Sequence, residues 1–276
     1  MTERNFALLI DAKWNEQKFL CIGLDPGFEK IPDSARKRTI RDTFVSFNAA
    51  IVDATEDIVC AYKPNPAFYE AQGVEGWQAL KDTIDYIRDT ASDIPVILDA
   101  KRGDIGTTNV DYAKMAFDFF GADAITVQPY QGGDALAPFF ERRDKGIFVL
   151  VRTSNNGAAE FQDLKVDGVP LYTVISRAIA EKWNEAGNCG VVVGTTYPRE
   201  IGEVRSVIGD IPMLMPGVGA QGGDLEASVK AGKNSRGAGF IVNASRVIIF
   251  ASTGKDFADA ARAKAQELHA AIRKAL

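Results

Sequence analysis

The chain has 276 residues, of which 46% are apolar and 25% are charged. These values are typical of a soluble globular protein and exclude the disordered, collagen-like and coiled-coil classes. The formal net charge of −5 at pH 7 argues against a surface dedicated to nucleic acid or to anionic membranes. We therefore expect neither a nucleic-acid partner nor a membrane partner.

Targeting signals and metal-ligand clusters are not visible in the sequence. No apolar run approaches the ~20 residues that a membrane-spanning helix needs, and residues 1–5 lead into a charged amphipathic segment rather than a signal-peptide core. The three cysteines, Cys21, Cys60 and Cys189, are far apart, which is typical of buried thiols in a reducing compartment. The single histidine, His269, disfavours a histidine base or a histidine-rich zinc site. We expect a cytoplasmic protein without a metal, in which carboxylates and ammonium groups carry any chemistry.

Short apolar runs rich in β-branched residues recur along the chain, and most of them precede a helical pattern. The runs are residues 20–24, 58–62, 95–98, 124–127, 146–151, 190–193, 212–215 and 239–242. Continuous apolar runs of this length are typical of parallel strands that are covered on both faces.

The stretches between these runs have helical periodicity. In residues 40–51 the apolar positions recur at helical spacing, as they do in 108–120 and 257–272. No linker or composition shift divides the chain. The pattern predicts an α/β protein with one (β/α)8 barrel domain over residues 1–276 and an extra amino-terminal helix near 6–14. A doubly wound open sheet is the alternative.

Charged residues follow three neighbouring strands of the predicted barrel. Asp25 follows the first strand and Lys63 ends the second. Asp99 and Lys101 lie at the carboxyl end of the third strand, where strand alternation points them to the same face. Asp104 comes shortly afterwards. Because barrels carry their active sites at this end, we interpret these charges as a site, although an ion-pair network that only ties the strand ends together is the alternative.

A second polar group follows the last two predicted strands. Residues 216–223 read PGVGAQGG, and Ser245 and Arg246 follow the next strand. Glycines let backbone N–H groups approach an anion closely, and an arginine adds a forked donor. This arrangement predicts a phosphate site; a tight turn beside a surface arginine is the alternative. The long polar loop after the fifth strand, residues 152–162, has the composition of either a lid over a small ligand, extending over 155–167, or an ordinary surface loop.

The charged residues also resemble a known family. Residues 99–108 read DAKRGDIGTT and resemble the D-x-K-x-x-D-I-x-x-T signature of the orotidine 5′-phosphate decarboxylase family. Further similarity lies in residues 23–26 (GLDP), 63–65 (KPN), 67–70 (AFYE), 152–155 (RTSN), 216–223 (PGVGAQGG) and 245–246 (SR). These segments occur in the family's order and together extend from the first to the eighth strand of the predicted barrel. The RTSN segment resembles the longer, type 2 branch.

The resemblance implies a homodimeric enzyme that converts orotidine 5′-phosphate to UMP and CO2 without a cofactor or a metal. It implies that Lys101 gives a proton to C6 of the pyrimidine and that Lys63, Asp99 and Asp104 complete the charged array. Asp104 would enter the site of the neighbouring subunit, with Thr108 nearby. In addition, the resemblance implies that substrate is bound by Asp25, Thr108, Ser154, Pro216, Gln221, Gly222, Ser245 and Arg246. Asp25 and Lys63 would hold the ribose, Ser154 the pyrimidine edge, Pro216 the base, and Gln221 and Arg246 the phosphate.

One position departs from the family pattern, and two other functions stay open. Asn156 stands where a proline is expected after the Ser-Asn pair, which affects the stiffness of the predicted lid. A metal-dependent phosphosugar barrel is one alternative, although Lys63 would repel a cation at the second strand. A nucleotide-binding barrel without activity is the other. Given the length of the chain, we expect orotate phosphoribosyl transfer to reside on a separate protein.

Overall fold

The computed structural model describes residues 4–218 and 224–276. Within them, eight strands form one sheet in the spatial order β2-β1-β10-β9-β8-β5-β4-β3, with every neighbouring pair parallel. A parallel bridge between Tyr62 and Val96 joins the two ends of this order. The sheet is therefore a nearly closed barrel, which confirms the predicted (β/α)8 fold and makes the open-sheet alternative wrong.

Each predicted apolar run overlaps one barrel strand. The strands are β1 (Leu20–Ile22), β2 (Ala61–Tyr62), β3 (Ile97–Arg102), β4 (Ala124–Val127), β5 (Gly146–Arg152), β8 (Cys189–Val193), β9 (Met213–Pro216) and β10 (Phe240–Ala244). Almost all residues of these strands are buried, because side chains on one face fill the barrel and those on the other face pack under helices.

Helices surround the barrel. They are α1 (Phe6–Asn15), α2 (Ile40–Thr55), α3 (Pro66–Glu70), α4 (Gly73–Thr90), α5 (Gly106–Ala113), α6 (Gly133–Phe140), α7 (Ala159–Gln162), α8 (Leu171–Ala178), α9 (Pro198–Ile208), α10 (Leu225–Gly232), α11 (Arg246–Ile249) and α12 (Phe257–Ala275). The predicted apolar faces are buried, as Phe44 and Phe47 of α2 and Ala261 of α12 show. No helix in the described ranges is long and apolar enough to cross a bilayer.

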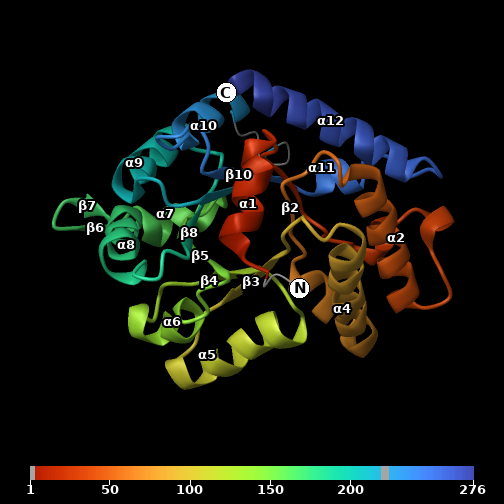
Figure 1. Ribbon diagram of the computed structural model, residues 1–276, viewed down its shortest axis with the longest axis horizontal. Coiled ribbons are helices and arrows are strands. Elements are labelled where there is room, and N and C mark those ends of the chain that lie inside the picture. Colours follow the sequence, from red (N-terminus) through yellow and green to blue (C-terminus); the bar gives the residue numbers. More distant parts are fainter. Residues whose placement is uncertain (1–3, 219–223) are drawn as a thin grey trace.

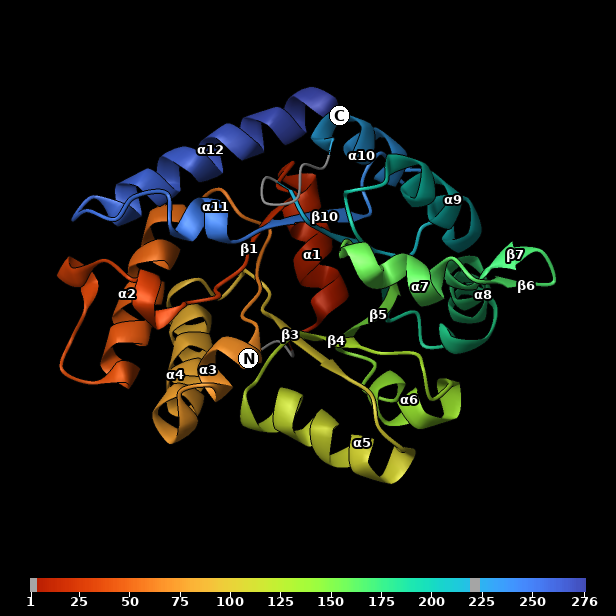
Figure 2. The ribbon, with the colours of Figure 1, turned by 180° about the vertical axis from the view of Figure 1, so that it is seen from behind.

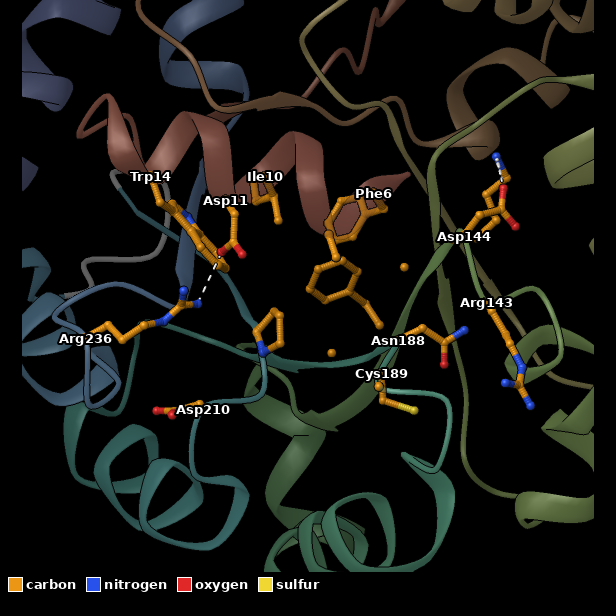
Figure 3. A pocket seen from close by; sticks show the side chains of 17 residues that line it. Phe6, Ile10, Asp11, Trp14, Arg143, Asp144, Asn188, Cys189, Asp210 and Arg236 are labelled. Carbon is orange, nitrogen blue, oxygen red and sulfur yellow. Dashed lines mark hydrogen bonds and ion pairs between the residues drawn. The ribbon is translucent and has the colours of Figure 1, made fainter. Parts of the chain in front are cut away.

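Helix α1 is the predicted extra helix, and it crosses the centre of the ring of helices in both views (Figures 1 and 2). The Phe6 ring packs edge-on against Phe148 of β5, with the ring centroids 5.5 Å apart. Trp14 Nε1 donates a hydrogen bond of 2.9 Å to the carbonyl of Phe240, the first residue of β10. Figure 3 shows this end of the barrel, with α1 and the ion pair between its Asp11 and Arg236. The helix thus covers the amino end of the barrel and leaves the carboxyl end open.

The long loop after β5 is more ordered than its composition indicates. It contains α7 and then an antiparallel hairpin of β6 (Lys165–Val166) and β7 (Val169–Pro170). The hairpin turns at Asp167 and Gly168, whose φ values of 52° and 82° suit a two-residue turn. Sequence periodicity misses this hairpin because each of its strands has only two residues.

The packing of α1 leads to a stability prediction. Phe6→Ala removes a ring that is 5% exposed, so we expect it to lower the free energy of unfolding by about 3–5 kcal/mol. Leu8→Ala on the same helix is the control, because Leu8 is 71% exposed and its loss should change stability by less than about 0.5 kcal/mol. Urea unfolding, monitored by circular dichroism, measures the free energy of unfolding of both variants. Equal effects of the two changes would contradict the packing described for α1.

Candidate active site

The centre of the site is a carboxylate held between two ammonium groups. Asp99 on β3 accepts a hydrogen bond of 2.7 Å from Lys63 Nζ at one oxygen and another of 2.7 Å from Lys101 Nζ at the other. The side chain of Lys63 is 4% exposed and that of Asp99 is 12% exposed, whereas Lys101 is 42% exposed. The structure therefore brings three of the predicted residues together, and Lys101 presents the ammonium that a ligand can reach.

The pKa values of the buried pair follow from this geometry. Burial alone would raise the pKa of Asp99, but Lys63 and Lys101 outweigh it and hold the pKa well below the ordinary range. For Lys63 burial alone would lower the pKa, but Asp99 and Asp25 outweigh it and hold the pKa above the ordinary range. Both groups are therefore charged across the neutral pH range, and the array is a fixed set of charges.

The backbone conformation that brings Lys101 to Asp99 is not evident from the sequence. Its φ is 48°, in the left-handed region, which costs a non-glycine residue about 1–3 kcal/mol. The prediction that Asp99 and Lys101 share a face holds, but regular strand alternation is the wrong reason, because the register between β3 and β4 shifts within this segment. Thr126 of β4 contacts both residues and was not predicted as part of the site. A hydroxyl inside an otherwise apolar buried strand is the signal that could have found it.

Asp25 lies beside this array at the end of β1. Its Oδ2 accepts a hydrogen bond of 2.7 Å from Ser245 Oγ, and its charge raises the pKa of Lys63. Its Oδ1 is buried and has no hydrogen-bond partner among the described residues. A buried carboxylate oxygen without a donor is costly, so this atom is suited to accept a hydrogen bond from a ligand.

A small pocket of about 140 Å³ opens next to Asp25, at the carboxyl ends of β9 and β10. Ser154, Pro216, Ser245 and Arg246 line it, as predicted for a common binding site. Gln221 and Gly222 lie outside the described residues. The pocket therefore places one cation, two hydroxyls and one carboxylate around a volume that suits a small polar group.

Asp104 and Thr108 lie apart from the array in this chain. The described hydrogen bonds of Asp104 join it to Ile105 and Asn109, at the beginning of α5, and Thr108 lies in the first turn of that helix. Ile105 is 57% exposed and Val110 is 42% exposed. Within the described part of the chain, Asp104 thus contacts Ile105 and Asn109 rather than the Lys63–Asp99–Lys101 cluster, and exposed apolar side chains lie in the same segment.

Side-chain contacts join the beginning of the loop after β5 to residues 162 and 163. The Arg152 side chain, 4% exposed, forms an ion pair of 2.9 Å with Asp163 and lies over the ring of Tyr197, 4.9 Å from its centroid. Gln162 Oε1 accepts a hydrogen bond of 2.8 Å from the backbone N–H of Thr153. These contacts, which sequence analysis did not identify, hold both ends of the 153–162 segment close to the pocket.

The described residues contain no group of three or more histidine, cysteine or acidic side chains with a metal-binding arrangement. In the array itself, both oxygens of Asp99 already pair with ammonium groups. A divalent cation at this carboxylate would have to displace or repel these lysines, so the donor set suits an organic ligand with negative charge.

The buried pair leads to a prediction about stability and pH. Asp99→Asn leaves the ammonium of Lys63 without its closest partner, so we expect a loss of roughly 3 kcal/mol in the free energy of unfolding at pH 7. Asp111→Asn, at a carboxylate that is 80% exposed, is the control and should change little.

The sign of the pH dependence follows from the depressed pKa of Asp99. Its contribution is present above the unfolded-state pKa of about 4 and is lost as the pH falls below that value. The raised pKa of Lys63 adds a contribution that is present below about pH 10 and is lost above it. The difference between the wild type and Asp99→Asn, measured by urea unfolding, should therefore be constant from about pH 5 to 9 and shrink below about pH 4. A difference that grows on acidification would contradict the charge assignment.

Comparisons with known proteins identify the family of this chain. Residues 18–262 match the model of the "Orotidine 5′-phosphate decarboxylase / HUMPS family". The chain is 50% identical over 258 residues to an orotidine 5′-phosphate decarboxylase of Cellvibrio japonicus, covering 94% of each protein. It is 46% identical over 266 residues to one from Janthinobacterium sp. (strain Marseille), covering 96% of this chain and 97% of that protein.

A solved structure has the same fold. The orotidine 5′-monophosphate decarboxylase of Leishmania donovani superposes with a TM-score of 0.83 at 37% identity, covering 98% of this chain and 99% of that one. Residues 18–262, which match the family model, include every strand of the barrel and every residue of the Lys63–Asp99–Lys101 cluster. The chain therefore belongs to the orotidine 5′-phosphate decarboxylase family.

Proposed function

We propose that this protein decarboxylates orotidine 5′-phosphate to UMP and CO2, the last step of de novo pyrimidine nucleotide synthesis, by means of the Lys63–Asp99–Lys101 cluster. The observation that carries this proposal is a buried carboxylate paired with two ammonium groups, one of them accessible, beside a small polar pocket. Two relatives that are 50% and 46% identical to this chain, cover 94% and 96% of it and bear the name of this enzyme support it.

The chemistry explains why fixed charge is needed. When the bond between C6 and the carboxylate breaks, its electron pair stays on C6 in the plane of the ring and cannot delocalise into the π system. The anion must then be stabilised by a charge that is already in place. The Lys101 ammonium does this and passes a proton to C6, while CO2 leaves and solvent restores the proton on Lys101. Asp99 fixes the lysines and, being near the departing carboxylate, repels it in the bound substrate.

The remaining residues hold the parts of the substrate that do not react. Asp25 Oδ1, which has no donor among the described residues, accepts a hydrogen bond from a ribose hydroxyl, and the Lys63 ammonium donates one to the ribose. Ser154 hydrogen-bonds the pyrimidine edge and Pro216 packs against the base, while Ser245 and Arg246 bind the phosphate with Gln221 and Gly222. Contacts remote from C6 assist the reaction by orienting the ring and by closing the loop after β5.

We also propose how the enzyme is assembled. Residues 1–276 act as one barrel domain, and two copies form a homodimer in which Asp104 and Thr108 enter the partner's site. The exposed Ile105 and Val110, which lie in the same segment as Asp104 and Thr108, support this, because apolar surface of this kind is buried when two copies meet. The protein acts in the cytoplasm, in agreement with its three free, buried cysteines.

A direct assay distinguishes this activity from that of a metal-dependent phosphosugar barrel. We expect the absorbance of orotidine 5′-phosphate to fall in buffer that contains EDTA, at the same rate as without it. Activity that disappears with EDTA and returns with Mg²⁺ would favour the metal-dependent reaction. UMP binding without CO2 release would favour a nucleotide-binding barrel without activity.

The role of Lys101 is tested by substitution. Lys101→Ala should lower kcat by about 10³-fold or more and still bind UMP, since its ammonium acts on C6. Lys114→Ala is the control, because Lys114 is 61% exposed and, among the residues that the structure describes, forms an ion pair with Asp111 alone. Initial rates and UMP titration calorimetry check the two variants. A Lys101→Ala rate near that of the wild type would remove the proton-donor role.

The shared site is tested by mixing two inactive variants. Lys101→Ala and Asp104→Ala damage different halves of each site, so a mixed dimer has one intact site. After equal mixing and exchange of subunits we expect about one quarter of the wild-type activity. A mixture that is no more active than its two components would contradict the contribution of Asp104 across the dimer.

A further inference from the structure

Strand β3 bulges at the position of the charged array. Leu98 pairs with Ile125 and Arg102 pairs with Val127. Three residues of β3, numbers 99–101, therefore face the single residue Thr126 of β4. A bulge redirects the side chains that it carries, and here it carries two of the three residues of the array.

The hydroxyl of Thr126 holds this bulge at two points. It accepts a hydrogen bond of 3.0 Å from the backbone N–H of Lys101 and donates one of 2.8 Å to Asp99 Oδ1. The same Asp99 oxygen accepts from Lys101 Nζ at 2.7 Å. One hydroxyl thus fixes both the backbone of the lysine and the carboxylate with which its ammonium pairs.

The geometry leaves the hydroxyl little freedom. Thr126 is fully buried, and a β-branched side chain in a strand has few χ1 rotamers. Its only proton goes to Asp99, so its lone pairs face the Lys101 N–H. Since Lys101 has a φ of 48°, its backbone lies outside the ordinary strand region and depends on contacts of this kind to stay there.

We propose that Thr126 is a positioning residue of the decarboxylation, which aims the Lys101 ammonium at C6 by fixing the Lys101 backbone and the Asp99 carboxylate together. This inference rests on the proposed function. Thr126 itself touches no substrate. A residue that only joined β3 to β4 would affect the stability of the fold and leave the rate of the folded enzyme unchanged.

The test compares three variants. Thr126→Val keeps the shape and removes both hydrogen bonds, whereas Thr126→Ser keeps the hydroxyl. Thr43→Val is the matched control, because Thr43 is also fully buried and its hydroxyl also accepts from a backbone N–H, that of Lys37 at 2.9 Å, while donating to the Thr39 carbonyl at 2.7 Å. It lies on α2, outside the catalytic array.

We expect Thr126→Val to lower kcat about 100-fold, the order of loss that a misplaced catalytic group produces, with KM changed less than about threefold. Thr126→Ser should restore most of kcat, and Thr43→Val should retain the wild-type kcat. If Thr126→Val does not fold, Thr126→Cys, whose thiol is a weak donor, should fall below Thr126→Ser in kcat. A wild-type kcat in Thr126→Val, or equal kcat values in the serine and cysteine variants, would overturn the inference.

A double variant separates positioning from a structural role. If Thr126 acts through Lys101, Thr126→Val should change the residual kcat of Lys101→Ala by less than about threefold. An undiminished 100-fold effect in that background would overturn the inference and leave the proposed function intact. A wild-type chain that releases no CO2 from orotidine 5′-phosphate would instead overturn the proposed function, and this inference with it.

Discussion

The site depends on one carboxylate, that of Asp99, which forms an ion pair with each of two lysines. Without it, the nearly buried ammonium of Lys63 would lack its closest partner, and the accessible ammonium of Lys101 would lack the contact that directs it. A lone charge that is buried as deeply as that of Lys63 destabilises the fold. The array is therefore stable only as a unit, which is the property required of charges that must be in place before the carbon anion forms.

The barrel supplies this unit with a rigid frame and an open end. Lys63 directly follows β2 and Asp99 lies in the neighbouring strand β3. These two strands close the barrel, so the sheet sets the separation of the two residues. At the other end, α1 covers the beginnings of β5 and β10 through Phe6 and Trp14. Stability and chemistry thus occupy opposite ends of the same strands, as expected for this fold.

The sequence predicts the barrel well because its physical signals are local. Continuous apolar runs locate all eight strands, and polar residues directly after them locate Asp25, Lys63 and Asp99 at one end. The bulge at Lys101 and the contact with Thr126 could not be predicted, because both arise from the pairing of two strands. The hairpin at 165–170 was missed since its strands are too short to show alternation. The assignment of Asp104 to a partner's site came from the family resemblance alone.

The central claim is that the Lys101 ammonium stabilises and protonates an in-plane anion at C6. It can be tested on the reverse step, the removal of the C6 proton from UMP. By microscopic reversibility, a group that delivers this proton also removes it, so the wild type should exchange the C6 hydrogen of UMP for deuterium in D2O. Proton NMR of UMP follows this exchange without any decarboxylation. The account predicts exchange with the wild type and none above the uncatalysed rate with Lys101→Ala. Equal exchange rates in the two proteins would contradict it.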